Sequence, residues 1–306
     1  METNYLPTDY QKFIAISKYA RWIPELNRRE TWDETVNRYI QFFQRRFSSS
    51  STEDGRGIDF PSSSLYTSNI DSGTIWDELR SSILNLDIMP SMRCMMTAGP
   101  ALERDEVAGY NCSAQAITGR GKEIELWNKD IEEIIGQPIT LSLKNPIAFD
   151  EGMYILLCGT GLGFSVERQF INHLPTIGKN LSRRIYTRNN INYPGVAKDE
   201  LSYFDKKENT IRVADSKYGW ASALRILITE LYNGNSPEWD MSKVRPAGAP
   251  LKTFGGRASG PKALDELFRF ITDIFNKAYG RKLTSIECHD ICCKIGESVV
   301  IGGVEA

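Results

Sequence analysis

The alternation of short apolar runs, glycine turns and helical patterns beyond Pro90 constrains the fold more than any other feature of this 306-residue sequence. Two segments repeat apolar side chains at helical spacing before a glycine that can end a helix: 220–231 before Gly234 and 264–278 before Gly280. Three short runs are typical of strands: 163–166, 210–214 and 243–245. Alternating strands and longer helices favour an α/β fold for this part of the chain.

The C-terminal segment predicts one more helix and one more strand. Ser285 can cap a helix that runs to about Glu297, and residues 298–301 are typical of a strand that ends at Gly302 and Gly303. A double glycine after a strand usually begins a turn, so we expect the backbone here to turn toward another element.

The first part of the chain predicts a helical region instead. Thr31 and Glu34 fit a capping box, in which the hydroxyl and the carboxylate each bind a backbone amide left open at the start of a helix. Another helix is expected at about 74–86. The Ser- and Gly-rich stretch 48–64 cannot bury enough apolar surface to fix itself, so we predict a flexible loop. Residues 1–90 are therefore expected to form a helical lead-in.

Charge and composition argue against several classes of protein. The chain carries 37 Lys and Arg against 39 Asp and Glu, a net charge of -2 spread along the sequence, which argues against a dedicated nucleic-acid binder. Its apolar runs are shorter than a membrane span, and its first residues lack a basic-then-apolar signal pattern. Six unevenly spaced cysteines do not suit a secreted disulfide scaffold. We expect a soluble, cytoplasmic protein.

Two groups of cysteines are candidates for chemistry. Cys112 lies in the short polar segment AGYNCS at 108–113, where a ligand could approach the thiol, although residue type alone favours a small buried side chain. The second group comprises Cys288, His289, Cys292 and Cys293. On a single helix its two pairs point about a hundred degrees apart, which favours packing in the core over a closed metal site. We therefore predict no metal.

Two glycine-rich segments leave alternatives open. GTGLG at 159–163 follows a helical pattern and precedes a strand, which is the reverse of the order in a dinucleotide-binding loop. It is either a tight turn or a place where the backbone approaches a ligand closely. The basic run at 242–260 is either a phosphate-binding loop or a solvated connection.

His173 has no Ser or Cys partner at a recognisable spacing, so the sequence does not support a hydrolase triad.

Several segments resemble one family in the order in which they occur along the chain. They are MPSMR at 89–93, MTAG at 96–99, ALERD at 101–105, AGYNCS at 108–113, GTGLGFSVER at 159–168, the run at 242–260, and ECHD at 287–290 through GGV at 302–304. With them the chain resembles the adenosylcobalamin-dependent (class II) ribonucleotide reductases, and among these the monomeric ribonucleoside-triphosphate reductases. The lead-in 1–90 is a weaker match.

The resemblance implies a fold and a reaction. Residues 91–306 would be the N-terminal part of a ten-stranded α/β barrel, preceded by the helical region. In that family a thiyl radical, generated with adenosylcobalamin, removes the 3′-hydrogen of the ribose, and the 2′-hydroxyl leaves as water. A cysteine pair supplies two electrons by becoming a disulfide. Cys112 matches the first cysteine of that pair, so the resemblance implies a redox role for its thiol.

The resemblance also implies binding residues. Those for the substrate would be Thr97, Asn111, Gly161, Gly163, Gly302 and Gly303. Those for a deoxynucleotide effector would be Asp215, Lys217, Lys243 and Arg245. Residues 166–241 resemble the insertion that lets monomeric members build an effector site without a dimer interface.

Two departures from the family pattern set the remaining expectations. An additional segment, 118–145, follows Cys112, and we expect a loop or hairpin near the thiol. The radical cysteine, the second redox cysteine, the cobalamin-binding region and the terminal cysteine pair have no counterpart here. We expect a chain that is inactive without a C-terminal half on a separate polypeptide, and that acts with a ribonucleoside triphosphate, a deoxynucleotide effector and a thioredoxin-like or other dithiol reductant. The alternatives are a deoxynucleotide-binding regulatory module and an inert truncated fragment.

Overall fold

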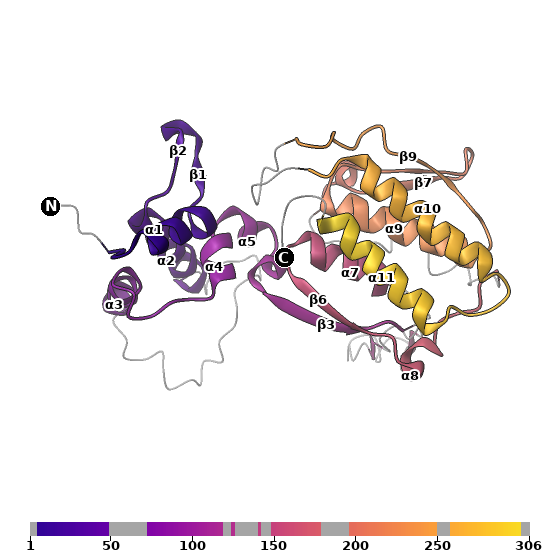
Figure 1. Ribbon diagram of the computed structural model, residues 1–306, viewed down its shortest axis with the longest axis horizontal. Helices are drawn as coiled ribbons and strands as arrows, with labels where there is room; N and C mark the ends of the chain where they lie inside the picture. The colour runs from indigo at the N-terminus through magenta and orange to yellow at the C-terminus, as the bar shows by residue number, and fades with distance from the viewer. Residues whose placement is uncertain are drawn as a thin grey trace, which may run out of the picture. The chain divides into compact units, whose positions relative to one another are not determined.

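The computed structural model describes residues 5–48, 72–118, 124–125, 140–141, 148–178, 196–249 and 258–300. The chain divides into two compact units, Met1–Asn111 (unit 1) and Cys112–Ala306 (unit 2) (Figure 1). The expected loop 48–64 beyond Ser48, nearly all of the segment 118–145, and Gly302 with Gly303 lie outside the described residues. None of the helices in the described ranges is long and apolar enough to cross a membrane.

Unit 1 is mainly helical and extends beyond the expected lead-in 1–90, as far as Asn111. Its elements are α1 (Asp9–Ile14), the π-helix η1 (Ala15–Tyr19), β1 (Trp22–Ile23), η2 (Pro24–Leu26), β2 (Arg28–Arg29), α2 (Trp32–Ser48), α3 (Ser72–Leu84), α4 (Met92–Thr97), α5 (Pro100–Arg104) and η3 (Glu106–Gly109). The capping box is confirmed, because the Glu34 amide donates to the Thr31 hydroxyl at 3.3 Å and the Thr31 amide to the Glu34 carboxylate at 2.7 Å. The helix expected at 74–86 is α3.

The core of unit 1 forms where α2 packs against α3 and α4. Val36, Ile40 and Ile83 are buried there together with Trp32, whose indole N–H donates to the Leu84 carbonyl at 3.2 Å. Burial of each such aliphatic side chain contributes about 1.5–3 kcal/mol, so the spacing of apolar residues along α2 fixes which face of the helix turns inward.

Unit 2 combines helices and short strands. Its elements are β3 (Cys112–Ala116), β4 (Ile124–Glu125), β5 (Thr140–Leu141), α7 (Ala148–Leu157), β6 (Gly161–Ser165), α8 (Arg168–Ile171), η5 (Lys198–Glu200), β7 (Tyr203–Asp205), β8 (Thr210–Arg212), α9 (Lys217–Tyr232), β9 (Glu238–Asp240), α10 (Pro261–Lys277) and α11 (Ser285–Val300). β3 pairs with β6 in parallel, and β4 pairs with β5 antiparallel. β8 lies between an antiparallel β7 and a parallel β9.

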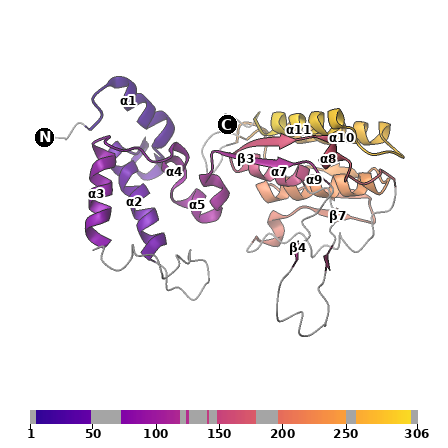
Figure 2. The same ribbon diagram turned by 90° about the horizontal axis from the view of Figure 1, so that it is seen from below.

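Four helices enclose the main core of unit 2. α7 packs against α9 and α11, and α10 packs against the same two helices (Figure 2). The predicted apolar repeats supply this core: Leu224, Leu227 and Leu231 from α9, and Leu264, Leu267, Phe268, Ile271 and Phe275 from α10. Gly234 and Gly280 follow these helices with φ of 80° and 82°, which confirms them as the residues that end the helices.

Two predicted strands are wrong. Residues 243–245 lie in a turn, because the Ser242 amide binds the Asp240 carboxylate at 2.9 Å and the Val244 amide binds the Met241 carbonyl at 2.9 Å; the strand at this place is β9. Residues 298–300 continue α11, where the buried Ser298 hydroxyl donates to the Ile295 carbonyl at 2.7 Å. Because its hydroxyl binds a carbonyl of the same helix, Ser298 can be buried in α11 without an unsatisfied polar group.

The cap of α11 is also corrected by one residue. Thr284, and not Ser285, accepts a hydrogen bond from the Glu287 amide, at 3.3 Å, and its own amide donates to the Glu287 carboxylate at 2.8 Å. The segment Thr284–Glu287 therefore forms a second capping box, equivalent to the one that begins α2.

Candidate functional site

Cys112 is the first residue of β3 and is exposed. Residue type alone favoured burial, and that expectation is wrong. In the parallel ladder Cys112 lies opposite Gly161, and the hydroxyl of the next residue, Ser113, donates to the Gly161 carbonyl at 3.1 Å. The pairing of β3 with β6 therefore brings the cysteine and the glycine motif together, although they are far apart in the sequence.

The glycine motif lies between α7 and β6, the helix–turn–strand order that the sequence predicted. Gly159 has φ of 79°, so a tight turn does form at this point. Gly161 begins β6 and is half-buried, whereas Gly163 is exposed within the strand. At Gly161 and Gly163 this strand therefore presents backbone without side chains, directly beside the strand that carries the thiol.

Packing of α7 fixes the strand pair from one side. A Cβ on Gly152 of α7 would lie 2.8 Å from the Leu162 side chain and 2.9 Å from the Gln115 amide nitrogen. Gln115 in turn donates to the Ala148 carbonyl at 2.6 Å. A larger residue at Gly152 would have to displace the ends of these two side chains, so glycine favours the close packing of α7 on β3 and β6.

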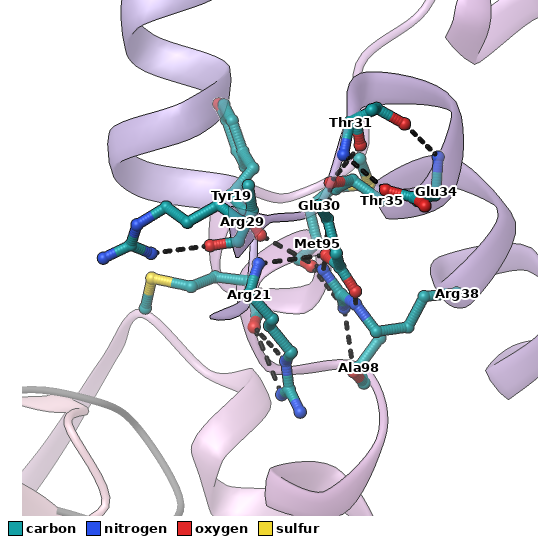
Figure 3. Close-up of polar contacts among 12 residues, drawn as sticks. Tyr19, Arg21, Arg29, Glu30, Thr31, Glu34, Thr35, Arg38, Met95 and Ala98 are labelled. Carbon is teal, nitrogen blue, oxygen red and sulfur yellow. Dashed lines mark hydrogen bonds and ion pairs between the residues drawn. The ribbon is translucent and has the colours of Figure 1, made fainter. Parts of the chain in front are cut away.

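Thr97 is buried in the last turn of α4, and its hydroxyl donates to the Arg93 carbonyl at 2.6 Å. Its backbone is held by two arginines that come from earlier in unit 1 (Figure 3). The bonds run from Arg21 to the carbonyls of Met96 (3.3 Å) and Thr97 (2.9 Å), and from Arg38 to those of Met95 (3.0 Å) and Ala98 (2.8 Å). Because a helix leaves its last carbonyls without partners, these guanidinium groups close the end of α4.

Glu30 balances the charge of the two arginines. Its carboxylate accepts from Arg38 Nε at 2.8 Å, from Arg38 Nη2 at 3.0 Å and from the Arg21 amide at 3.0 Å. Burial raises the pKa of Glu30, but the hydrogen bonds from Arg38 and Arg21 lower it more, and the net shift is downward. Burial and the neighbouring Arg38 charge lower the pKa of Arg21 to about 10. We refer to these three residues as the Arg21–Glu30–Arg38 network.

The four predicted effector residues lie in unit 2 in three different settings. Asp215 and Arg245 form an ion pair with Nε to Oδ2 at 2.8 Å, each side chain about one-third exposed. Lys243 is exposed in the turn after β9. Lys217 begins α9, where its ammonium lies 5.0 Å from the ring centres of Tyr154 and Tyr218. The ion pair joins two of the four residues, while Lys217 is held by aromatic rings.

The Cys288–Cys293 group is divided between the core and the surface. Cys288 and Cys292 are buried in α11, which confirms the predicted packing, and burial raises the pKa of both thiols, that of Cys292 to about 12. His289 and Cys293 are exposed, which the packing prediction missed, with Cys293 Sγ 3.6 Å from His289 Nε2. Within the described ranges, no three His, Cys, Asp or Glu side chains are placed to hold a metal ion. His173, the other histidine, is exposed in the turn after α8.

The sequence reasoning missed the residues that connect distant segments. Arg21, Glu30 and Arg38 gave no local signal, because the carbonyls that the arginines bind are 57 to 76 residues further along the chain. Asp150 in α7 and Arg225 in α9 were missed for the same reason. They form a buried ion pair, with Arg225 Nε 2.6 Å from the carboxylate.

The chain is similar in structure to a ribonucleotide reductase. The chain superposes on the crystal structure of a B-12 dependent (class II) ribonucleotide reductase with a TM-score of 0.63 and 28% sequence identity, over 94% of this chain and 40% of that one. A family model described as the insertion domain of B12-dependent ribonucleotide reductase matches residues 182–275.

Curated relatives with similar sequences belong to the ribonucleoside-triphosphate reductases. The adenosylcobalamin-dependent ribonucleoside-triphosphate reductase of Lactobacillus helveticus is 31% identical over 94% of this chain and 39% of that protein. The enzyme of the same name from Lactobacillus leichmannii is 30% identical over 94% of this chain and 38% of its own length. The chain is thus a homologue of the class II ribonucleotide reductases, as its motifs indicated, and it spans about two fifths of the length of these relatives.

Proposed function

We propose that this chain supplies part of a B12-dependent ribonucleoside-triphosphate reductase, which converts ribonucleotides to deoxyribonucleotides. The observation that carries the proposal is the similarity to such reductases along 94% of the chain. The exposure of Cys112 at the start of β3, opposite Gly161 of β6, supports the same function. A thiol that reduces a ribose must be within reach of the substrate.

In this proposal the Cys112 thiol is one of two that reduce the substrate. Each turnover removes the 2′-hydroxyl as water, and the two thiols give up two electrons and two protons while their sulfurs join as a disulfide. The second thiol and the thiyl radical belong to the part of the reductase that this chain does not span. A dithiol such as a thioredoxin-like protein then returns the disulfide to two thiols.

The substrate would lie against the backbone of β6. Gly161 and Gly163 leave room beside Cys112 for a ribose, and Asn111, which is exposed, immediately precedes the thiol in the sequence. Thr97 would act through the backbone at the end of α4, since its hydroxyl is already bonded to Arg93. Gly302 and Gly303 would contribute a further backbone contact, and residues 91–306 would be the first part of a ten-stranded barrel.

A deoxynucleotide effector would bind to unit 2, within or beside the matched insertion domain. Lys243, exposed after β9, and Arg245, oriented by Asp215, supply the positive charge that phosphates require. Lys217 would add a third cation from the start of α9. Allosteric control by this site is part of the proposal.

We assign no cobalamin-binding residue within the described ranges of this chain. The relatives are adenosylcobalamin-dependent, so we propose that the cofactor is held mainly by the remainder of the reductase, on a separate polypeptide or otherwise, and that turnover needs this remainder.

The test is a reduction assay with a ribonucleoside triphosphate, adenosylcobalamin and a dithiol, in which the chain is combined with the remainder of the reductase from the same source. Formation of deoxynucleotide that is abolished by Cys112→Ser is expected, and Cys293→Ser, which removes another exposed cysteine, should leave it unchanged. Full activity of the Cys112→Ser protein would overturn the redox role. A complete but inactive mixture whose chain still binds deoxynucleotides would establish a regulatory module instead.

A further inference from the structure

Cys158 and Lys217 bring a thiol and an amine together in unit 2. Cys158 is buried in the turn that follows α7, and Lys217 is the first residue of α9. The Lys217 Nζ donates to the Cys158 Sγ at 3.3 Å, although the two residues are 59 positions apart. Burial usually keeps a thiol inert, but an ammonium at this distance stabilises the thiolate, which is the reactive form.

Aromatic side chains hold the lysine in this position. Tyr154 of α7 and Tyr218 of α9 stack with ring centres 5.4 Å apart, and the Lys217 ammonium lies 5.0 Å from each centre. A cation is attracted to the face of an aromatic ring at this range. The ammonium is thereby directed toward the sulfur.

The backbone at both ends of the contact is fixed as well. The Ser216 hydroxyl caps α9 by accepting from the Gly219 amide at 2.8 Å, and a Cβ on Gly219 would lie 2.3 Å from the Ala214 carbonyl oxygen. The Cys158 amide donates to the Tyr154 carbonyl at 3.0 Å. The nitrogen and the sulfur therefore stay in contact without a rearrangement of either helix.

We propose that Cys158 and Lys217 form a covalent cross-link when the protein meets a peroxide. Hydrogen peroxide oxidises the thiol to a sulfenic acid with release of one water, and the lysine amine then attacks the sulfur, which forms a sulfur–nitrogen bond and releases a second water. The thiol loses two electrons to the peroxide, and the amine loses its proton to solvent before it attacks. A second equivalent of peroxide would place one oxygen atom between sulfur and nitrogen, with one further water released.

Formation of the link would change unit 2 at two points. It would join the turn before β6 to the start of α9, and it would remove the positive charge of Lys217. Cys112 and Cys293 are more exposed than Cys158, and Cys293 Sγ lies 3.6 Å from His289 Nε2. Oxidation at those residues gives sulfenic acids or disulfides, whereas Cys158 has an amine within reach. The cross-link would form whether or not the chain serves a reductase.

The experiment treats the purified chain with hydrogen peroxide, blocks remaining thiols and digests the product with trypsin for mass spectrometry. Cleavage gives peptide 145–168, which contains Cys158, and normally separates 213–217 from 218–225. A linked Lys217 resists trypsin, so we expect 145–168 joined to 213–225 with the loss of two hydrogens, or with this loss and the gain of one oxygen. Treatment with dithiothreitol should release both peptides.

Matched variants separate this link from general oxidation. Lys217→Arg keeps the charge and the helix but removes the amine, and Cys158→Ser removes the sulfur, so both should lose the linked peptide. Lys243→Arg and Cys293→Ser should retain it. Unfolding the chain in urea before oxidation should abolish it, since only the fold brings the two groups together. The proposal would be overturned if Cys158 were recovered only as sulfinic acid, sulfonic acid or a disulfide. It would also be overturned if the linked peptide persisted in Lys217→Arg.

Discussion

Each unit buries one carboxylate against an arginine, and the two carboxylates respond in opposite ways. Glu30 in unit 1 accepts hydrogen bonds from Arg38, the Arg21 amide and the Thr35 hydroxyl, and its pKa falls below the ordinary value. Asp150 in unit 2 is fully buried; desolvation outweighs the attraction of Arg225 and raises its pKa to about 7. Glu30 is less deeply buried and accepts from more donors, so its pKa falls, whereas complete burial outweighs the single arginine at Asp150.

The largest effect should come from the network of unit 1. Arg38→Met removes the guanidinium that binds the Glu30 carboxylate and the partner of the Met95 and Ala98 carbonyls, so we expect a loss of about 5 kcal/mol in the stability of unit 1. Urea unfolding, with hydrogen exchange to assign the effect to unit 1, measures it. Arg45→Met on the same helix replaces an exposed arginine and should change stability by less than about 1 kcal/mol. Equal effects of the two variants would contradict the role of the network.

A smaller effect that depends on pH is expected in unit 2. Arg225→Met removes the partner of Asp150 and should cost about 3 kcal/mol at pH 8, where the carboxylate is ionised. At pH 5 the loss should be smaller, because an acid with a pKa of about 7 is then protonated and needs no counter-ion. Unfolding curves at both pH values test this, with Arg269→Met on the exposed side of α10 as the control. A loss independent of pH would show that Asp150 stays ionised.

Asp150 should also make unit 2 less stable as the pH rises. Its folded pKa, about 7, lies above its ordinary value of 3.8, so the folded state binds the extra proton and the contribution is fully present below about pH 4. It is lost progressively as the pH rises from about 4 through about 7. Asp150→Asn should flatten this part of the stability profile. An unchanged slope in the variant would assign the pH dependence to other groups.

The smallest effects test what the two units have in common. Thr31 begins α2 and Thr284 begins α11 with the same capping box, and each Glu of the pair has a pKa lowered to about 2, first by hydrogen bonds from Arg28 or Arg281. Thr31→Ala and Thr284→Ala should each cost about 1 kcal/mol in urea unfolding. Ser285→Ala, beside the true cap, should have almost no effect. A larger loss for Ser285→Ala than for Thr284→Ala would restore the cap that the sequence suggested.

Much of the fold could be predicted because its signals are local. The capping box at Thr31, the apolar repeat of α10 and the ends at Gly234 and Gly280 each depend on residues within about one or two helical turns. The errors arose where local signals compete. The valines at 244, 299 and 300 have strand propensity. However, the Asp240 carboxylate binds the Ser242 amide and turns the first segment, and the second segment continues helix α11.

The candidate site was predicted only as separate residues. Cys112 and the glycine motif could be named from the resemblance to reductases, but their pairing across β3 and β6 depends on a parallel ladder between distant segments. The exposure of Cys112 likewise follows from its place at the start of a strand. Residue type, which favours burial of cysteine, carries no information about this position.

The sequence by itself determined the capping box at Thr31, the glycines that end α9 and α10, the apolar faces of the helices and the family that the motifs resemble. Only the tertiary structure decided which charges meet: Arg21 with the end of α4, Arg225 with Asp150, and Lys217 with Cys158. A cap or an apolar stripe needs only neighbours in the chain, which the sequence places at fixed distances. An ion pair or a raised pKa depends on which groups packing removes from water and brings within about 3 Å, and no local pattern encodes this.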